Sequence, residues 1–180
     1  VLTDPGMSTQ PDWLILPGVG AFDHGRQRLR DSGFDGFLQS HATSTRILGI
    51  CLGMQLLCEG SEEGVEPGLG LLPGRFVRFP DHTEIGLRVP HMGWNDTVFH
   101  GGNHHPMGFE EAFRFYFVHS FHYAPAESPV VWGLSEYGRR FASAIHRENI
   151  YGVQFHPEKS HRYGMRFLSH LLGPACSDHA

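Results

Sequence analysis

The segment from Arg46 to Gln55 constrains the fold more than any other stretch, because it places a cysteine on the turn between an apolar strand and a helix. It reads Arg-Ile-Leu-Gly-Ile-Cys-Leu-Gly-Met-Gln, with a glycine two residues to either side of Cys51. Small residues at these places tolerate a sharp backbone turn and let a substrate approach closely. Cys51 is therefore predicted to project from the sheet as a nucleophile.

The helix that follows is expected to favour the thiolate of Cys51. Unpaired N–H groups and the positive end of the helix dipole both stabilise negative charge at a helix start. The N–H of Leu52 would be free to hold an oxyanion. An alternative is that Cys51 is a buried small hydrophobic residue, as most free cysteines are.

A candidate base and its orienting group follow a second apolar run, residues 150–155. The sequence continues as His156-Pro157-Glu158. In extended backbone, residues two apart point to the same side, and the proline fixes φ between them. Glu158 is expected to orient the imidazole of His156, which would take the proton of Cys51. The pair of motifs therefore predicts a Cys51/His156/Glu158 triad, against the reading that His156 merely ends a strand.

Together these residues resemble the class I, triad-type glutamine amidotransferases. Five further segments resemble the glutaminase subunit of imidazole glycerol phosphate synthase, from histidine biosynthesis: residues 16–22, 68–74, 89–95, 116–120 and 152–160. They run in order over nearly the whole chain, and Pro-His-Met-Gly-Trp-Asn at residues 90–95 is specific to that subunit and its close relatives. The resemblance implies an α/β, flavodoxin-like three-layer sandwich with a mixed central sheet. A single domain over residues 1–180 is expected, with a polar tail at 173–180.

The resemblance also assigns roles to residues outside the triad. The N–H of Val19 would rotate inward, between Gly18 and Gly20, to complete the oxyanion hole with Leu52. Glutamine would be bound by a set from the elbow helix and a later strand end: Gly53, Gln55, His119, Ser120 and Phe121. Lys159 would contact the partner subunit. Ordinary readings remain open for two of these, a simple strand-end turn at residues 17–20 and a solvated lysine.

The implied activity is that of a glutaminase, which hydrolyses glutamine to glutamate and ammonia through a Cys51 thioester. Ammonia would pass to a (β/α)8 cyclase partner, in a heterodimer that makes imidazole glycerol phosphate and aminoimidazole carboxamide ribotide. No metal or organic cofactor is expected. Two alternatives stay open: a related subunit that feeds ammonia to a sugar-modifying synthase, and an inactive fragment.

Composition sets bounds that agree with this. A chain of 180 residues with 40% hydrophobic content can bury one core, and its net charge of −5 gives no basic footprint for nucleic acid. No membrane-length apolar run or signal peptide is recognisable, so a cytoplasmic location is expected. Of the three cysteines, Cys58 is expected in the core and Cys176 as a free thiol in the tail. The His-rich segment at residues 100–105 is interpreted as a surface insertion, not a metal site.

The start of the chain departs from the family pattern. The first strong strand, residues 12–16, runs straight into Pro17, whereas relatives have a strand–helix unit before this point. We expect that unit to be missing, with an uncovered sheet edge beside the strand that ends at Leu16. The other expected helices are 23–31, 34–41, 161–172 and the elbow helix continued through Glu59. Expected strands are 47–50, 75–79, 115–120, 130–135, 141–146 and 150–155, at least partly antiparallel, with 61–74 and 81–106 irregular.

Overall fold

The computed structural model describes residues 1–6, 11–80, 86, 88–100 and 112–173. Its elements follow one another as β1 (Trp13–Gly18), α1 (Phe22–Asp31), α2 (Phe34–His41), β2 (Arg46–Cys51), α3 (Leu52–Leu57), β3 (Gly60–Ser61), β4 (Arg75–Arg78), β5 (His91–Phe99), β6 (Ala112–His119), β7 (Phe121–Ala124), β8 (Val131–Glu136), β9 (Arg140–Arg147), β10 (Ile150–Val153), the 3-10 helix η1 (Pro157–Lys159) and α5 (His161–Leu172).

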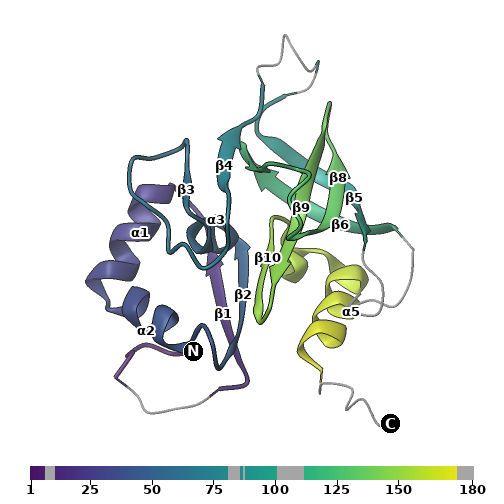
Figure 1. Cartoon of the computed structure of the whole chain (residues 1–180). Helices are drawn as coiled ribbons and strands as arrows, with labels where there is room; N and C mark the ends of the chain where they lie inside the picture. The colour runs from purple at the N-terminus through teal and green to yellow at the C-terminus, as the bar shows by residue number, and fades with distance from the viewer. Residues whose placement is uncertain (7–10, 81–85, 87, 101–111, 174–180) are drawn as a thin grey trace.

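A mixed sheet forms the centre of the molecule. Its main path has the order β1-β2-β10-β9-β7-β4-β3, and β5, β6 and β8 join beside this path. Helices α1 and α2 lie on one side of the sheet and α5 lies on the other (Figure 1). This is the α/β three-layer architecture with a mixed sheet that the family resemblance implies.

The parallel part of the sheet positions the functional residues. Strand β2 pairs in parallel with both β1 and β10, so the carboxyl ends of all three meet at one edge. The register sets Gly18 at the end of β1 opposite Cys51 at the end of β2. Ligands bind at this edge of open α/β sheets, because the loops that leave the strands converge there.

Strand β2 is apolar and buried from Ile47 to its end, because both of its faces are covered there. Ile47 belongs to a cluster with Leu38 of α2 and Met54 of α3. The next residue, Leu48, belongs to the opposite cluster with Phe167 of α5. Alternate residues of one strand therefore bind the two helical layers to the sheet, as a side-chain period of two requires.

Several sequence predictions are confirmed and others are wrong. Helices α2 and α5 match their predicted ranges, and β6, β8 and β9 fall within a few residues of theirs. The elbow helix ends at Leu57 and not at Glu59, because Cys58 turns to extended backbone with ψ −174°. The region 81–106, predicted to be irregular, contains the nine-residue strand β5. Glycine and asparagine weaken its strand signal, but pairing along β6 from Val98 to His91 overrides that local preference. Strand β7 was also not predicted.

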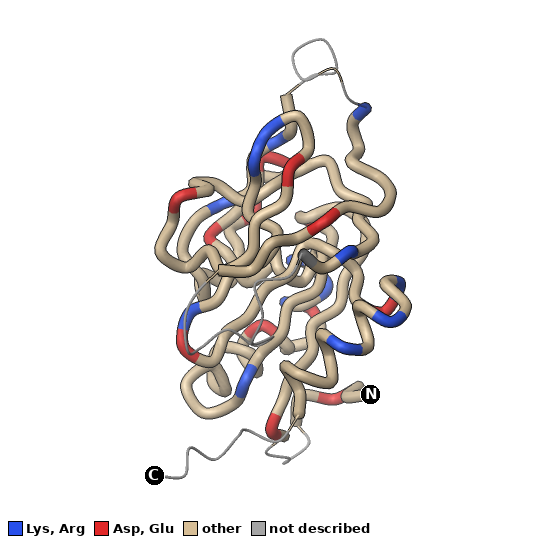
Figure 2. The backbone as a smooth tube through the Cα atoms, turned by 90° about the vertical axis from the view of Figure 1, so that its right-hand side faces the viewer, with Lys and Arg blue, Asp and Glu red and all other residues tan. Residues whose placement is uncertain are grey.

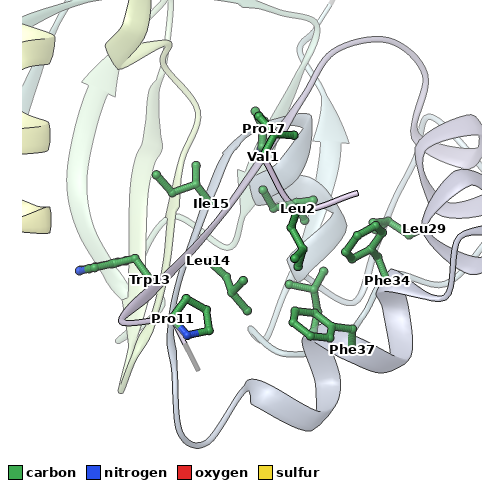
Figure 3. A pocket seen from close by; sticks show the side chains of 12 residues that line it. Val1, Leu2, Pro11, Trp13, Leu14, Ile15, Pro17, Leu29, Phe34 and Phe37 are labelled. Carbon is green, nitrogen blue, oxygen red and sulfur yellow. The ribbon is translucent and has the colours of Figure 1, made fainter. Parts of the chain in front are cut away.

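Strand β1 has an open edge within the described part of the chain, since its pairing there is with β2 alone. An apolar cavity of about 530 Å³ lies beside it (Figure 3). Leu14 of β1 lines this cavity together with Leu29, Phe34 and Phe37 of the two helices. The expected open edge beside Leu16 is thus present in the described part of the chain.

The surface carries charges of both signs. Lys and Arg are interspersed with Asp and Glu over the described backbone (Figure 2), in keeping with the modest net charge of −5. None of the described helices has the length and apolar character needed to cross a membrane.

Candidate active site

Cys51 stands on the strained turn that the sequence predicts. It is the last residue of β2 and the N-cap of α3, with φ 53° and ψ −112°. A positive φ is uncommon for a residue with a side chain, and such strain is found mostly at functional sites. The predicted elbow is therefore confirmed in its geometry.

The two glycines that flank Cys51 are required by close backbone packing. A Cβ on Gly53 would stand 1.8 Å from the carbonyl oxygen of Leu16, and one on Gly49 would stand 2.7 Å from the carbonyl oxygen of Gly53. No side chain fits at either distance, so the sharp turn and the contact between α3 and β1 depend on glycine at both positions.

The thiol of Cys51 does not have the lowered pKa that the sequence predicts. Cys51 is 7% exposed, and burial raises its pKa to about 11. The Leu52 N–H favours the thiolate, as expected, but the loss of hydration outweighs it, and the charge of Glu158 also opposes ionisation. Cys51 is thus a neutral thiol before substrate binds, and attack requires a base.

His156 has the arrangement of such a base. Its Nδ1 lies 2.7 Å from Oε1 of Glu158, so Nδ1–H donates to the carboxylate. Its Nε2 is buried and has no hydrogen-bond partner among the described residues. The contact is formed by the turn of η1 and not by the extended backbone that was predicted, since Pro157 begins a 3-10 helix.

Backbone contacts hold His156 in place. Its N–H donates to the carbonyl oxygen of Tyr116 on β6, at 2.9 Å. The hydroxyl of the buried Ser160 donates to the carbonyl oxygen of His156 at 2.6 Å and accepts the N–H of Tyr116 at 3.0 Å. The base is therefore fixed to β6 on both sides, which restricts its motion relative to the sheet.

A cavity of about 350 Å³ joins the predicted residues. Most of the sequence-predicted site lines it: Cys51, His156, Val19, Gly20, Leu52, Gln55, His119, Ser120 and Phe121. Gly18 and Gly53 lie at close backbone contacts beside it and are not part of its lining. Glu158 and Lys159, which follow His156 in the chain, are exposed and do not line the cavity. The roles of individual residues in catalysis, oxyanion binding and substrate binding stay predictions.

Gln154 is a contact of the thiol that sequence reasoning missed. Its Nε2 donates to the Sγ of Cys51 at 3.6 Å, and its Oε1 accepts from Nε2 of Gln55 at 3.4 Å. The sequence held one signal for this contact: Gln154 is a single amide in an apolar run. It stands two residues before His156, and so on the same side of an extended chain. Three further lining residues also went unpredicted: Glu63, Pro90 and Val118.

Some predictions fall outside the described residues. These are Cys176 and all of the His-rich segment except His100. Within the described ranges, no group of three or more His, Cys, Asp or Glu residues could hold a metal ion. Cys58 is free and fully buried, as predicted.

The geometry defines a class of protein. A cysteine on a strained strand-to-helix turn, an imidazole oriented by a carboxylate and a cavity shared by both are the parts of an α/β enzyme with a cysteine nucleophile. The sequence model of one family, described as Glutamine amidotransferase class-I, matches residues 7–171. The chain belongs to this family, and it is a glutamine amidotransferase.

Relatives that are similar to this chain bear the name of one subunit within the family. The chain is 44% identical over 179 residues to "Imidazole glycerol phosphate synthase subunit HisH" of Aromatoleum aromaticum, covering 96% of this chain and 84% of the relative. It is 48% identical over 164 residues to the subunit of the same name in Geobacillus thermodenitrificans, covering 89% and 76%. A solved structure titled "Crystal structure of glutamine amidotransferase" matches with a TM-score of 0.68 and 18% identity, over 94% of this chain and 84% of that one. That likeness supports the fold.

Two buried histidines near the cavity make stability sensitive to acid. Burial lowers the pKa of His91 to about 4 and that of His119 to about 3, from 6.5. Because the folded pKa values are depressed, the unfolded chain binds the extra protons, and stability present above pH 6.5 is lost as pH falls towards 4. We expect the free energy of unfolding to drop by up to about 2.7 kcal/mol per pH unit from these two groups.

Urea titrations at pH 7, 6 and 5 would measure this slope. The His91→Phe variant should lose about half of it, because one of the two protons is removed. Equal slopes in the variant and the parent chain would contradict the assignment.

Proposed function

We propose that this chain is the glutaminase subunit of an imidazole glycerol phosphate synthase and supplies ammonia for histidine biosynthesis. The observation that carries the proposal is the cavity that Cys51 and His156 line together, with Nε2 of His156 left without a hydrogen-bond partner among the described residues. The relatives with 44% and 48% identity that bear this subunit's name support the choice of acceptor reaction.

The first half of the reaction forms a thioester. His156 Nε2 takes the proton of Cys51 while Sγ attacks the carboxamide carbon of glutamine. The negative charge on the carboxamide oxygen is held by the N–H groups of Leu52 and Val19. His156 then gives the proton to the nitrogen as the C–N bond breaks, and ammonia leaves. Because the free thiol has a pKa of about 11, proton transfer to His156 has to accompany attack.

The second half returns the enzyme to its starting state. His156 Nε2 takes a proton from water, and the hydroxyl attacks the thioester carbon. The C–S bond breaks, glutamate leaves, and the proton returns to Cys51. Glu158 accepts the Nδ1–H of His156 throughout, which fixes the tautomer and stabilises the imidazolium formed in each half.

The amino acid head of glutamine would be bound on the α3 side of the cavity. The Oε1 of Gln55 is buried and has no partner among the described residues, so it is available to accept from an ammonium group. His119, Ser120 and Phe121 line the same cavity. Burial of these groups favours a ligand that replaces every lost hydrogen bond, which gives specificity for glutamine.

A partner surface is supported by exposed apolar residues on β5. Met92 is 60% exposed and Trp94 is 41% exposed, on the same face of the strand. Trp94 stacks on His161 at 5.5 Å, and His161 follows the exposed Lys159 closely in the chain. Clustered apolar exposure with a nearby cation is typical of an interaction site. We propose that the (β/α)8 cyclase docks here, as a heterodimer, and receives the ammonia.

The test is glutaminase activity with and without that cyclase. Val19 is 75% exposed beside Gly20, whose φ is 100°, so its peptide is free to change orientation. We expect the isolated chain to be nearly inactive and the assembled synthase with its bound nucleotide substrate to gain at least about 100-fold, as a ligand-biased two-state switch allows.

Glutamate release should be compared for the chain alone, with the cyclase, and with the cyclase plus its substrate. The control is the Cys51→Ala variant in each assembly. High activity in the lone chain would contradict the switch. Activation by a sugar-modifying synthase in place of the cyclase would overturn the choice of partner.

A further inference from the structure

His119 links the wall of the cavity to a hydrogen-bonded chain that runs away from it. It ends β6 and is 5% exposed. Its Nδ1 lies 2.8 Å from the carbonyl oxygen of Phe121, across the turn into β7. A carbonyl oxygen only accepts, so Nδ1 carries a proton and ties the two ends of this turn together.

His91 is the next group in the chain. It stands opposite His119 in the β5–β6 ladder, and its Nδ1 lies 2.9 Å from Nε2 of His119. Since burial keeps both rings neutral at neutral pH, Nε2 of His119 has a lone pair and Nδ1 of His91 must donate to it. The Nε2 of His91 is then an acceptor.

Asn95 supplies the donor to that acceptor and fixes the direction of the chain. Its Nδ2 lies 3.2 Å from Nε2 of His91 and 2.8 Å from the carbonyl oxygen of Glu136. Its Oδ1 accepts the N–H of Asp96 at 2.8 Å, so the amide orientation is set by its partners. A proton added to either ring would leave His91 with an N–H at Nε2, facing the N–H donor of Asn95. The full set of hydrogen bonds therefore requires both rings to be neutral.

Within the described part of the chain, the ring of His91 is hydrogen-bonded to His119 and Asn95 and is otherwise enclosed by aromatic rings. The residue is 2% exposed and lies between the rings of Tyr137 and Phe117, with centroids at 4.0 and 4.8 Å. It does not line the cavity, although Pro90, its neighbour in sequence, does. The side chain of His91 therefore reaches the cavity wall through its hydrogen bond to His119.

We propose that His91 is a positioning residue for glutamine: by donating to Nε2 of His119 it holds the His119 ring in place, and thereby the turn from His119 to Phe121 that forms one wall of the cavity. The proposal rests on the proposed glutaminase function and deepens it. Its direct consequence is on binding, because the turn contacts the substrate's amino acid and not the reacting atoms.

The His91→Phe variant tests the proposal. Phenylalanine keeps the stacking between Tyr137 and Phe117 but cannot donate, which leaves the buried Nε2 of His119 without a partner. In the synthase assembled with its cyclase and bound nucleotide substrate, we expect KM for glutamine to rise about tenfold and kcat to change less than about twofold. The matched variant is His91→Asn, whose amide nitrogen stands near the position of Nδ1 and can still donate. The KM of the His91→Asn variant for glutamine should lie close to that of the parent.

The ¹⁵N resonances of His119 give a second readout that does not depend on activity. NMR of the full chain should show His119 protonated at Nδ1 in all three proteins, because the carbonyl oxygen of Phe121 still accepts there. The Nε2 resonance should shift in His91→Phe, where its lone pair loses the donor, and stay close to the parent value in His91→Asn.

Three results would overturn the proposal. The first is an unchanged KM in a folded His91→Phe variant, and the second is a proton on Nε2 of His119 in the parent chain. The third is an equal fall of kcat and loss of melting temperature in both variants, which marks a structural role alone. If the parent synthase releases no glutamate, the proposed function fails and so does the claim about KM. The ¹⁵N resonances of His119 still decide whether the hydrogen bonds between Asn95, His91 and His119 exist.

Discussion

Glutamate release is expected to fall by at least about 10⁴-fold in the Cys51→Ala variant, measured in the assembled synthase. Loss of a covalent nucleophile removes the thioester route altogether, and water held in the cavity has no comparable route to the carboxamide. Cys51→Ser should be similarly inactive, because a hydroxyl is far harder to ionise than a thiol. The melting temperature of each variant controls for folding.

Labelling separates Cys51 from the other thiols. A glutamine-like electrophile should modify Cys51 and spare Cys58, which is fully buried and whose pKa is raised by burial. Peptide mass spectrometry after modification gives the labelled residue, and excess glutamine should protect it. Modification of Cys58 in place of Cys51 would show that the nucleophile is wrongly assigned.

Removal of the base is expected to have the second largest effect. His156→Asn should lower kcat by about 10³-fold or more, because both proton transfers pass through Nε2. Glu158→Gln should cost about 10- to 100-fold, because its side-chain oxygen can still accept the Nδ1–H at 2.7 Å and only the charge is lost. The side chain of Glu158 is 51% exposed, so water already screens part of that charge.

Steady-state assays of both variants over a range of glutamine concentrations would show which substitution lowers kcat more. The matched control is His170→Asn, the same substitution at an exposed position of α5, which should leave kcat and KM unchanged. A larger loss in Glu158→Gln than in His156→Asn would show that the carboxylate takes part in the chemistry beyond orientation.

Local sequence determined the parts of this protein that depend on near neighbours in the chain. The glycine-flanked Cys51 predicts its own strained turn, because only small residues fit at those backbone approaches. The ranges of α2 and α5 follow from helical periodicity and from breakers such as Gly173. The contact of His156 with Glu158 is also local, although its geometry is helical and not extended.

Strand β5 and the wall of the cavity behind it were decided by the tertiary structure. Residues 91–99 contain glycine, asparagine and aspartate, which disfavour strands in isolation, and they form a strand because β6 pairs with them from Val98 to His91. Gln154 likewise gained its place beside Cys51 from residues more than 100 positions away in the chain. Pairing between distant segments leaves little local signal.

The protonation states of the site residues show most clearly what the local sequence decides and what the tertiary structure decides. Sequence located Cys51 at a helix start, and that position alone predicted a thiolate, since the nearby N–H groups are part of the local fold. The tertiary structure buried the thiol and raised its pKa to about 11, because desolvation depends on every segment that covers it. In the same way, the neutral ring of His119 is held by His91 and Phe121, partners that only the folded sheet brings within hydrogen-bonding distance.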